Sequence, residues 1–240
     1  ALNGTASSAI MGYAQWGSTL VSLSDTGESL YSFYGYVTDG IYQDLADLQT
    51  SPKPVKYPAN GVFDGANTVY VGDIKYKDLN GDGVINENDR TNIGSPMPKF
   101  TFGWNNTFRY KGFDLSVLFQ GAAGAYIWYS GDLVWPFARF SNVLADVKGN
   151  YWSKDNTPAQ NAKVDYPRMT SDSNPNNYQA SSYWTRSSDY IRLKNLEIGY
   201  SLPEAFCKRM GMAGCRFYLT GENLITWDKL SLIHISEPTR

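Results

Sequence analysis

The sequence has few residues of the kinds that carry metal or redox chemistry. It holds two cysteines, Cys207 and Cys215, and one histidine, His234, in 240 residues. The cysteines form no CxxC pair and have no neighbouring histidine, which argues against a zinc site and against a thioredoxin-type motif. Their spacing is compatible with a disulfide or with two free thiols, and we expect free thiols because spacing alone cannot establish the bond geometry.

Long apolar runs and blocks of like charge are also lacking. No stretch approaches the about 20 apolar residues that a transmembrane helix requires. The 21 basic and 23 acidic residues give a net charge of −2 with no long run of either sign, so the basic surface that binds nucleic acid is absent. The sequence thus argues against nucleic acid as a partner and leaves strands as the elements by which it could cross a membrane.

Aromatic residues, by contrast, are abundant. The chain contains 18 Tyr, 11 Phe and 7 Trp, although its hydrophobic content is only 42%. Aromatic side chains fit the pleated surface of extended strands. The composition therefore favours an all-β protein of the cell envelope or surface.

Four segments show the period-two alternation of strands with one apolar face. They are residues 100–110, 113–121, 196–202 and 215–227. Lys111 and Gly112 separate the first two segments, and Gly112 can take the positive φ of a tight hairpin. Leu118 breaks the alternation in the second segment, and Asn223 breaks it in the fourth. We predict long antiparallel strands paired as hairpins.

The connections between these strands differ in length. Short connections, residues 111–112 and 203–214, join them at one end, whereas residues 125–188 form a single long connection at the other. So long a loop is uncommon in a soluble sandwich, but outer-membrane barrels combine short periplasmic turns with long extracellular loops. We predict part of a transmembrane antiparallel β-barrel with a polar lumen. A soluble β-sandwich with one wet face produces the same alternation and stays open.

Residues 78–89 have the spacing of a calcium-binding loop, although the flanking sequence does not resemble EF-hand helices. The predicted oxygen ligands are Asp78, Asn80, Asp82, the carbonyl of Val84, Asn86 and Asp89. Asp89 is shorter than the usual Glu, which lowers the expected affinity towards that of extracellular sites. Since one short segment supplies every ligand, Ca²⁺ would act as a structural clamp. Asp, Asn and Gly also form turns without an ion, and that alternative remains.

Four stretches, taken in order, resemble a known family. They are GESLYSFYGYVTDGIYQ (27–43), the segment from VGDIKY to VLFQG (71–121), YWSKDNTPAQNAKVDYPRM (151–169), and SDYIRLKNLEIGYSLP with FYLTGENLITWDK (188–229). Together they resemble the C-terminal part of SusC/RagA-type TonB-linked proteins of the Gram-negative cell outer membrane. The resemblance implies that residues 1–229 are the C-terminal portion of a barrel of about 22 strands.

The family resemblance also implies how the whole protein works. A SusD-like surface lipoprotein would cover the barrel, and the TonB complex would power import through an N-terminal part that we expect to be missing here. The cargo would be an oligosaccharide or, in some members, a peptide, and outer-membrane lipid would surround the barrel. The alternative is a secreted, calcium-stabilised β-sandwich module that binds glycans.

An enzyme is not expected. Ser116 and Ser201 have no native histidine for a triad, and the acids of the long connection show no spacing typical of a general acid and base. Aromatic residues of the same connection could stack on sugar rings, pack the loop itself or dock to the surface lipoprotein. They are Trp128, Trp135, Tyr151, Trp152 and Trp184.

The two ends of the chain are unusual. Residues 230–240, LSLIHISEPTR, resemble the in-frame translation of a transposase-type sequencing adapter. We expect this tail to be non-native, which removes His234 from any chemistry and places the native sequence's last residue here near Lys229. The chain starts without Met or an apolar signal region, although an envelope protein needs an export signal, so we expect that preceding residues are missing.

Overall fold

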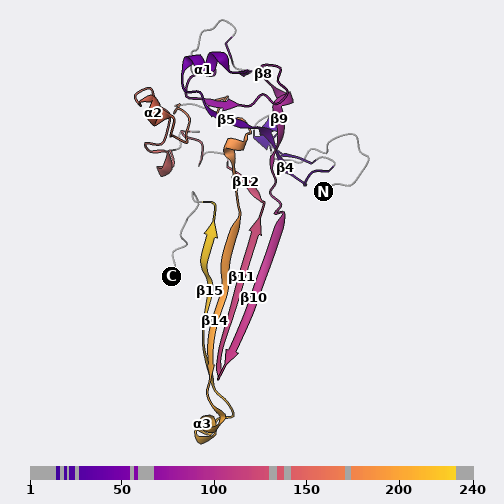
Figure 1. The fold of residues 1–240 in the computed structure, drawn as a ribbon, viewed down its shortest axis with the longest axis vertical. Helices are drawn as coiled ribbons and strands as arrows, with labels where there is room; N and C mark the ends of the chain where they lie inside the picture. Colours follow the sequence, from indigo (N-terminus) through magenta and orange to yellow (C-terminus); the bar gives the residue numbers. More distant parts are fainter. Residues whose placement is uncertain are drawn as a thin grey trace. The chain divides into compact units, whose positions relative to one another are not determined.

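The chain folds into two compact units (Figure 1). The computed structural model describes residues 15–16, 19–20, 22–24, 27–54, 57–58, 68–129, 134–137, 142–170 and 174–230. The loop unit comprises Ala1–Pro96 and Ile127–Arg186, and the sheet unit comprises Met97–Tyr126 and Ser187–Arg240. No helix within the described residues is long and apolar enough to cross a membrane. Apart from Leu230, the predicted tail lies outside these residues.

The sheet unit is a four-stranded antiparallel sheet with the order β10-β11-β14-β15. Its strands are β10 (Phe100–Tyr110), β11 (Phe113–Ala123), β14 (Tyr190–Ser201) and β15 (Arg216–Asp228). Lys111 and Gly112 join β10 to β11 with φ values of 46° and 87°, as a two-residue hairpin turn of type I′ requires. The predicted long strands and the first hairpin are confirmed.

Both short connections lie at the same end of this sheet (Figure 1). The second one contains α3 (Glu204–Arg209). Cys207 lies in this helix and is buried, and neither Cys207 nor Cys215 is in a disulfide in this structure. The sheet is open within the described residues, with β10 and β15 at its edges.

The register gathers the apolar positions of all four strands on one face. Residues paired directly across antiparallel strands point to the same side. Two successive rows across the sheet are Tyr110, Phe113, Tyr200 and Phe217, then Phe108, Leu115, Ile198 and Leu219. This face is uncovered, because Trp104 is 53% exposed and Leu219 is 74% exposed. A sandwich would bury these side chains against a second sheet, so the exposure disfavours the sandwich alternative.

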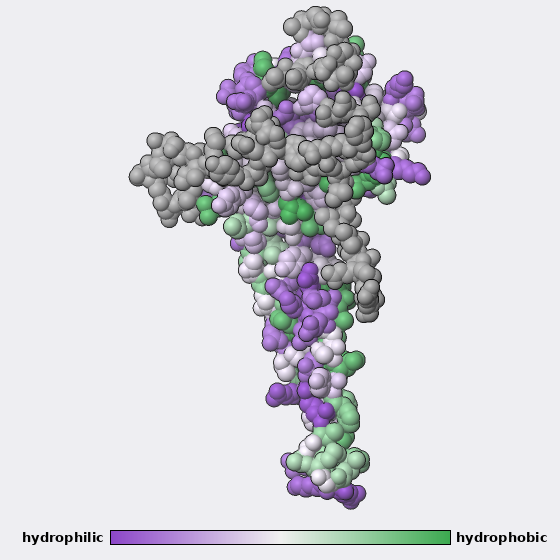
Figure 2. Space-filling model, turned by 180° about the vertical axis from the view of Figure 1, so that it is seen from behind, coloured by the Kyte–Doolittle hydropathy of each residue, from purple (hydrophilic) through white to green (hydrophobic). Residues whose placement is uncertain are grey.

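The opposite face carries charged side chains. Arg216 on β15 makes ion pairs with Asp114 on β11 and with Glu197 on β14, each with an N–O distance of 2.5 Å. The first pair crosses over Gly199, where an added Cβ would lie 2.6 Å from both charged groups. In Figure 2, hydrophilic residues run along the middle of this sheet and hydrophobic residues lie at its margin.

A β-bulge at Lys194 keeps the apolar face continuous along β14. Leu193 pairs with Phe119 and Asn195 pairs with Leu118, so Lys194 is the extra residue. One inserted residue reverses the alternation of a strand. As a result, the apolar residues before the bulge share a face with those after it, although their sequence parity differs.

The irregularity in β15 explains the residue that breaks its alternation. Asn195 pairs with Glu222 and Leu193 pairs with Ile225, so Asn223 and Leu224 are both extra. Asn223 has a φ of 52°, a left-handed conformation that Asn tolerates better than most residues. Two inserted residues preserve parity, and the apolar positions on either side of Asn223 stay on one face.

The short strands outside the sheet belong to the loops. They are β1 (Gln15–Trp16), β2 (Thr19–Leu20), β3 (Ser22–Leu23), β4 (Ser32–Tyr36), β5 (Thr38–Ile41), β6 (Lys53–Pro54), β7 (Ile74–Tyr76), β8 (Val84–Ile85), β9 (Arg90–Gly94), β12 (Tyr126–Trp128) and β13 (Thr185–Ser187). The helices are α1 (Leu45–Thr50) and α2 (Pro158–Asn161), with short 3-10 turns η1 (Glu87–Asp89), η3 (Ala145–Val147) and η4 (Ser182–Trp184). Strand is thus the main regular structure of the described residues, as expected of an all-β protein.

The loop unit has its own hydrophobic clusters. Trp135 and Trp184 are each 3% exposed and pack together with Trp128 and Tyr178. The rings of Trp135 and Tyr178 stack with centroids 4.6 Å apart. Of the uses considered for these tryptophans, packing of the loop is therefore the one observed for Trp135 and Trp184.

Candidate functional site

The predicted calcium loop, residues 78–89, lies among short strands. β8 falls inside it and pairs in parallel with β6, and the loop ends in a single 3-10 turn, η1. Gly81 and Gly83 have φ values of 76° and 82°, which glycine adopts at little cost. The loop therefore closes on itself without the flanking helices of an EF-hand.

Side-chain oxygens in the first half of the loop accept hydrogen bonds from its own backbone. Asp78 accepts the N–H groups of Gly81 and Gly83 at 2.6 and 2.7 Å. Asp82 accepts the N–H of Val84 at 2.8 Å, and the Asn80 side chain both accepts from and donates to Asp82 at 2.9 Å. These bonds bring the first three predicted ligands next to one another.

Asp89, the last predicted ligand, is fully buried and closes the loop. Its Oδ1 accepts the N–H of Leu79 at 2.9 Å, and its Oδ2 accepts the N–H of Asn86 at 2.8 Å. The hydrogen bond from the Gly83 N–H, with smaller contributions from the N–H groups of Gly81 and Asp82, holds the pKa of Asp78 below its usual value. Asp78 and Asp89 therefore lie together although they stand at opposite ends of the loop.

The structure places the predicted ligands in one loop but does not establish a metal site. Asn86 donates to the carbonyl of Val84 at 3.4 Å, so these two ligands are also adjacent. Across the described part of the chain, no three His, Cys, Asp or Glu side chains gather closely enough to hold a metal ion. A cation here would need the amide and backbone oxygens in addition to the carboxylates. Calcium binding stays a prediction.

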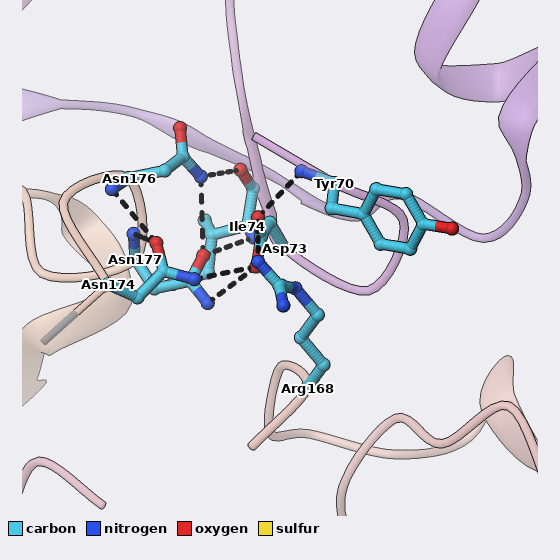
Figure 3. A network of polar contacts seen from close by, with 7 residues as sticks. All are labelled: Tyr70, Asp73, Ile74, Arg168, Asn174, Asn176 and Asn177. Carbon is cyan, nitrogen blue, oxygen red and sulfur yellow. Dashed lines mark hydrogen bonds and ion pairs between the residues drawn. The ribbon is translucent and has the colours of Figure 1, made fainter. Parts of the chain in front are cut away.

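A buried polar network, which the sequence analysis missed, lies just before this loop (Figure 3). The carboxylate of Asp73 accepts hydrogen bonds from the Tyr70 N–H at 2.8 Å, from Arg168 at 2.7 and 3.1 Å, and from Asn174 and Asn177 at 2.9 and 3.0 Å. Burial raises the pKa of Asp73, and the bonds and charge of Arg168 oppose that rise. Each donor stabilises the ionised carboxylate.

The network joins β7 to the end of the long connection between β11 and β14. Asn177 accepts the N–H of Ile74 at 2.8 Å, and Asn176 donates to the Ile74 carbonyl at 2.9 Å. Tyr76 donates to the carbonyl of Asn176 at 2.6 Å. Three asparagines within residues 174–177 were the sequence feature that could have pointed to this network. A polar stretch of this kind predicts an exposed loop unless the buried groups that it contacts are known.

A cavity of about 830 Å³ lies beside this network in the loop unit, within the usual size range of small-molecule sites. Its walls include Tyr70, Val71, Tyr151, Trp152, Arg168 and Met169. Gly72 has a φ of 91°, and an added Cβ would come within 2.4 Å of the Trp152 ring. Glycine at this position therefore allows the tryptophan to form the cavity wall.

Comparison with known proteins identifies the family. No protein-family model matches the sequence. The sequence is 34% identical over 206 residues to TonB-dependent receptor P3 of Formosa agariphila, covering 84% of this chain and 18% of the relative. The chain is a partial homologue of the TonB-dependent receptors. Receptors P26 and P39 of the same organism are 34% identical over 166 residues and 29% identical over 212 residues.

Solved structures share the fold. A chain of the RagAB peptide transporter matches with a TM-score of 0.61 and 19% identity, over 92% of this chain and 21% of that one. The RagAB peptide importer in its closed-closed state matches with a TM-score of 0.56 and 20% identity, over 90% and 21% of the two chains. The chain spans 18%, 16% and 20% of the lengths of the three Formosa receptors.

The partial homology to TonB-dependent receptors bears on three predictions. TonB-dependent receptors are outer-membrane proteins of Gram-negative bacteria, so the predicted location in the cell outer membrane is confirmed. They are transporters rather than enzymes, which agrees with the prediction that the chain is not an enzyme. The SusC/RagA-type resemblance is confirmed as partial homology together with a shared fold.

Proposed function

We propose that this chain forms part of the barrel wall of a TonB-dependent importer. Residues 1–229 would belong to the C-terminal portion of a transmembrane antiparallel barrel of about 22 strands. β10, β11, β14 and β15 would cross the membrane with their apolar face against lipid and their charged face towards the lumen. The observation that carries the proposal is the register, which separates apolar from charged side chains across all four strands.

The dimensions of the apolar face fit a membrane. The ten steps from Phe100 to Tyr110 span about 34 Å along the strand, which a tilt of about 40° reduces to about 26 Å across the bilayer. Outer-membrane barrels carry an apolar band about 25 Å tall between aromatic girdles. The row of Tyr110, Phe113, Tyr200 and Phe217 supplies aromatic residues at one edge, and Phe100 and Phe102 supply them at the other.

The lengths of the connections support an orientation. The two short connections would be periplasmic, as in other outer-membrane barrels. The connection between β11 and β14, and the loop that precedes β10, would then be extracellular. The loop at residues 78–89 would thus face a medium in which weak calcium sites are occupied.

In that setting, Ca²⁺ would clamp the loop through Asp78, Asn80, Asp82, Val84, Asn86 and Asp89. Asp78 and Asp89 carry like charges that repel when they lie together, and a divalent cation between them offsets this repulsion. Each carboxylate oxygen has two lone pairs, so an oxygen that accepts a backbone N–H can still bind the ion. The hydrogen bonds that lower the pKa of Asp78 favour its ionised form, which is the form that binds a cation.

The rest of the import machinery is proposed from the family. A SusD-like surface lipoprotein would cover the barrel, and the TonB complex would act through a part of the receptor outside this chain. The cargo would be an oligosaccharide or a peptide, and the fold shared with a chain of the RagAB peptide transporter supports a peptide. The cavity walled by Tyr151 and Trp152 is the place where the loop unit could contact cargo or lipoprotein.

Lipid accessibility of neighbouring strand positions tests the barrel-wall proposal. The complete receptor, with Cys207→Ala and Cys215→Ser, would carry a nitroxide at Leu115→Cys or, as the matched control, at Ser116→Cys. We expect oxygen from the lipid to collide preferentially with the label at 115, and a water-soluble nickel complex with the label at 116. Equal accessibility of the two labels to both reagents would contradict the proposal.

A further inference from the structure

We propose that α3 is an interfacial anchor that lies in the phospholipid headgroup region of the periplasmic leaflet and prefers anionic headgroups. The inference rests on the proposed function, because the sheet must cross the membrane for α3 to reach this leaflet. It adds a lipid contact beyond the apolar face of the strands.

The position of the helix follows from the strand before it. Tyr200 belongs to the last aromatic row of the apolar face, and Glu204, the first residue of α3, follows it by four residues. That segment spans at most about 13 Å and less when tilted, while the headgroup region extends about 5–8 Å beyond the hydrocarbon. The helix therefore begins at the level of the headgroups or just outside them.

Two large apolar side chains remain uncovered here, one on α3 and one on its C-cap residue. Phe206 is 51% exposed and Met210 is 59% exposed, and residues four apart lie on the same side of a helix. Cys207 occupies the inner side, where it is 1% exposed and its Sγ lies 3.8 Å from the carbonyl oxygen of Leu202. The fold thus buries a small residue and leaves the phenyl and thioether groups for another contact.

Charge at this end of the sheet complements anionic lipid. Lys208 and Arg209 occupy the last turn of α3, and Lys111 lies in the neighbouring hairpin turn. Glu204 pairs with Lys208 at 3.6 Å, with both side chains largely exposed. Figure 2 shows hydrophobic residues next to the sheet at this end and hydrophilic residues at the tip. That order, apolar first and basic beyond it, is typical of elements that lie in a membrane interface.

The depth of single labelled residues tests the anchor. The complete receptor, with Cys207→Ala and Cys215→Ser, is reconstituted into vesicles of phosphatidylethanolamine and phosphatidylglycerol and labelled with an environment-sensitive fluorophore. At Phe206→Cys we expect blue-shifted emission that nitroxide lipids quench, whereas at Lys208→Cys aqueous iodide quenches the label. Equal iodide quenching at both positions, or quenching at 206 by neither reagent, would overturn the anchor.

A third label separates this inference from the proposed function. Leu219→Cys, on the apolar face of β15, should be quenched by nitroxide lipids in the same vesicles. If position 219 is quenched and 206 is not, the anchor fails while the barrel wall stands. If 219 is not quenched, the barrel wall itself fails.

The preference for anionic headgroups has its own test. With Lys208→Glu and Arg209→Glu, we expect lipid quenching at Phe206→Cys to fall at least about twofold, because basic side chains near an anionic surface are attracted to it. The parent protein should show a similar fall in vesicles of phosphatidylcholine alone. Unchanged quenching in both experiments would overturn the headgroup preference.

Discussion

The fully buried carboxylate of Asp73 accepts two hydrogen bonds from the guanidinium of Arg168, at 2.7 and 3.1 Å, although 95 residues separate them in sequence. Asp73 immediately precedes β7, and the predicted calcium loop starts just after that strand. The pair therefore fixes the entry to this loop against the long connection between β11 and β14.

Removal of Arg168 should loosen the loop unit. Arg168→Ala leaves the buried carboxylate of Asp73 without its counter-charge, although its other hydrogen-bond donors remain, and breaking a buried ion pair costs about 3–5 kcal/mol. Hydrogen exchange of residues 70–76 in the complete receptor should rise sharply, and Asp73→Asn in the same background should restore part of the protection. Lys77→Ala is the control, because its pair with Asp39 is exposed, with an N–O distance of 3.9 Å, and is worth at most about 1 kcal/mol. Equal effects of the two alanine variants would contradict the conclusion that the Asp73–Arg168 pair holds the entry to this loop.

Calcium should protect the loop at residues 78–89 from protease. Asp82→Ala removes a predicted ligand and should weaken calcium binding roughly tenfold or more, since every oxygen of this small set is used. The measurement is cleavage within residues 71–95 of the complete receptor, with calcium or with a chelator. Glu87→Gln, an exposed change in the same loop outside the ligand set, should leave the protection intact. Identical cleavage of the parent protein in both conditions would show that the loop binds no calcium.

Acid should open the same loop when calcium is absent. The pKa of Asp78 is lowered in the folded protein, first by the Gly83 N–H, so its hydrogen bonds contribute stability above its ordinary pKa of about 3.9. This stability is lost as the pH falls through the lowered folded value. Hydrogen exchange of residues 78–86, corrected for intrinsic rates, should stay constant from neutral pH to about 4 and increase below it. Asp78→Asn should abolish this transition, and a transition that persists in the variant would assign it to another group.

Gly121 should tolerate no side chain. An added Cβ would lie 2.3 Å from the Phe102 ring and 2.8 Å from the carbonyl oxygen of Tyr190, and the backbone atom cannot move aside without distorting β14. Overpacking of this kind costs about 1–3 kcal/mol. The temperature at which the complete receptor loses its folded gel mobility should therefore fall for Gly121→Ala. Gly103→Ala, in β10 with open space around it, should show no fall, and an equal loss in both would contradict the packing argument.

A charge on the apolar face should be costly, and one on the polar face should not be. Val117 lies midway along the apolar face of β11, and Arg near the bilayer midplane costs about 2–4 kcal/mol in outer-membrane barrels. Urea titrations of the complete receptor in lipid vesicles should show this loss for Val117→Arg. Ser116→Arg, directly opposite Glu197, should be nearly neutral. A similar loss for both variants would mean that the two faces meet the same surroundings.

The sheet could be predicted from the sequence because the features that specify it lie within single strands and turns. Alternation of apolar and polar residues defines a face within a single strand, and Gly112 marks a turn by its own conformation. The two irregular points were less predictable: Lys194 left no visible signal, and Asn223 looked like a defect until the pairing with β14 showed a bulge. The aromatic row at Tyr110 and Phe217 also required the register, which single strands do not contain.

In the loop unit, only the conformation of the predicted calcium loop could be anticipated from the sequence. Residues 78–89 follow a fixed ligand spacing, so their closure on themselves could be anticipated. Asp73 and Arg168 are ordinary surface residues by type, and their burial depends on contacts across 95 positions. The sequence marked Trp135 and Trp184 as candidates for a role in binding or packing, but it did not show whether their rings point outward or into the core. An indole ring serves equally as a core residue or as a platform for sugar.

Because Lys194 is an extra residue, residues 190–193 of β14 present their apolar side chains on the apolar face only in the observed register. If that residue were deleted, Ile191 and Leu193 would rotate to the charged face of the sheet, and Arg192 would turn to the apolar face. The strand thus consists of two segments whose alternation is opposite in phase, and Lys194 is the residue that lets both present their apolar side chains on one face.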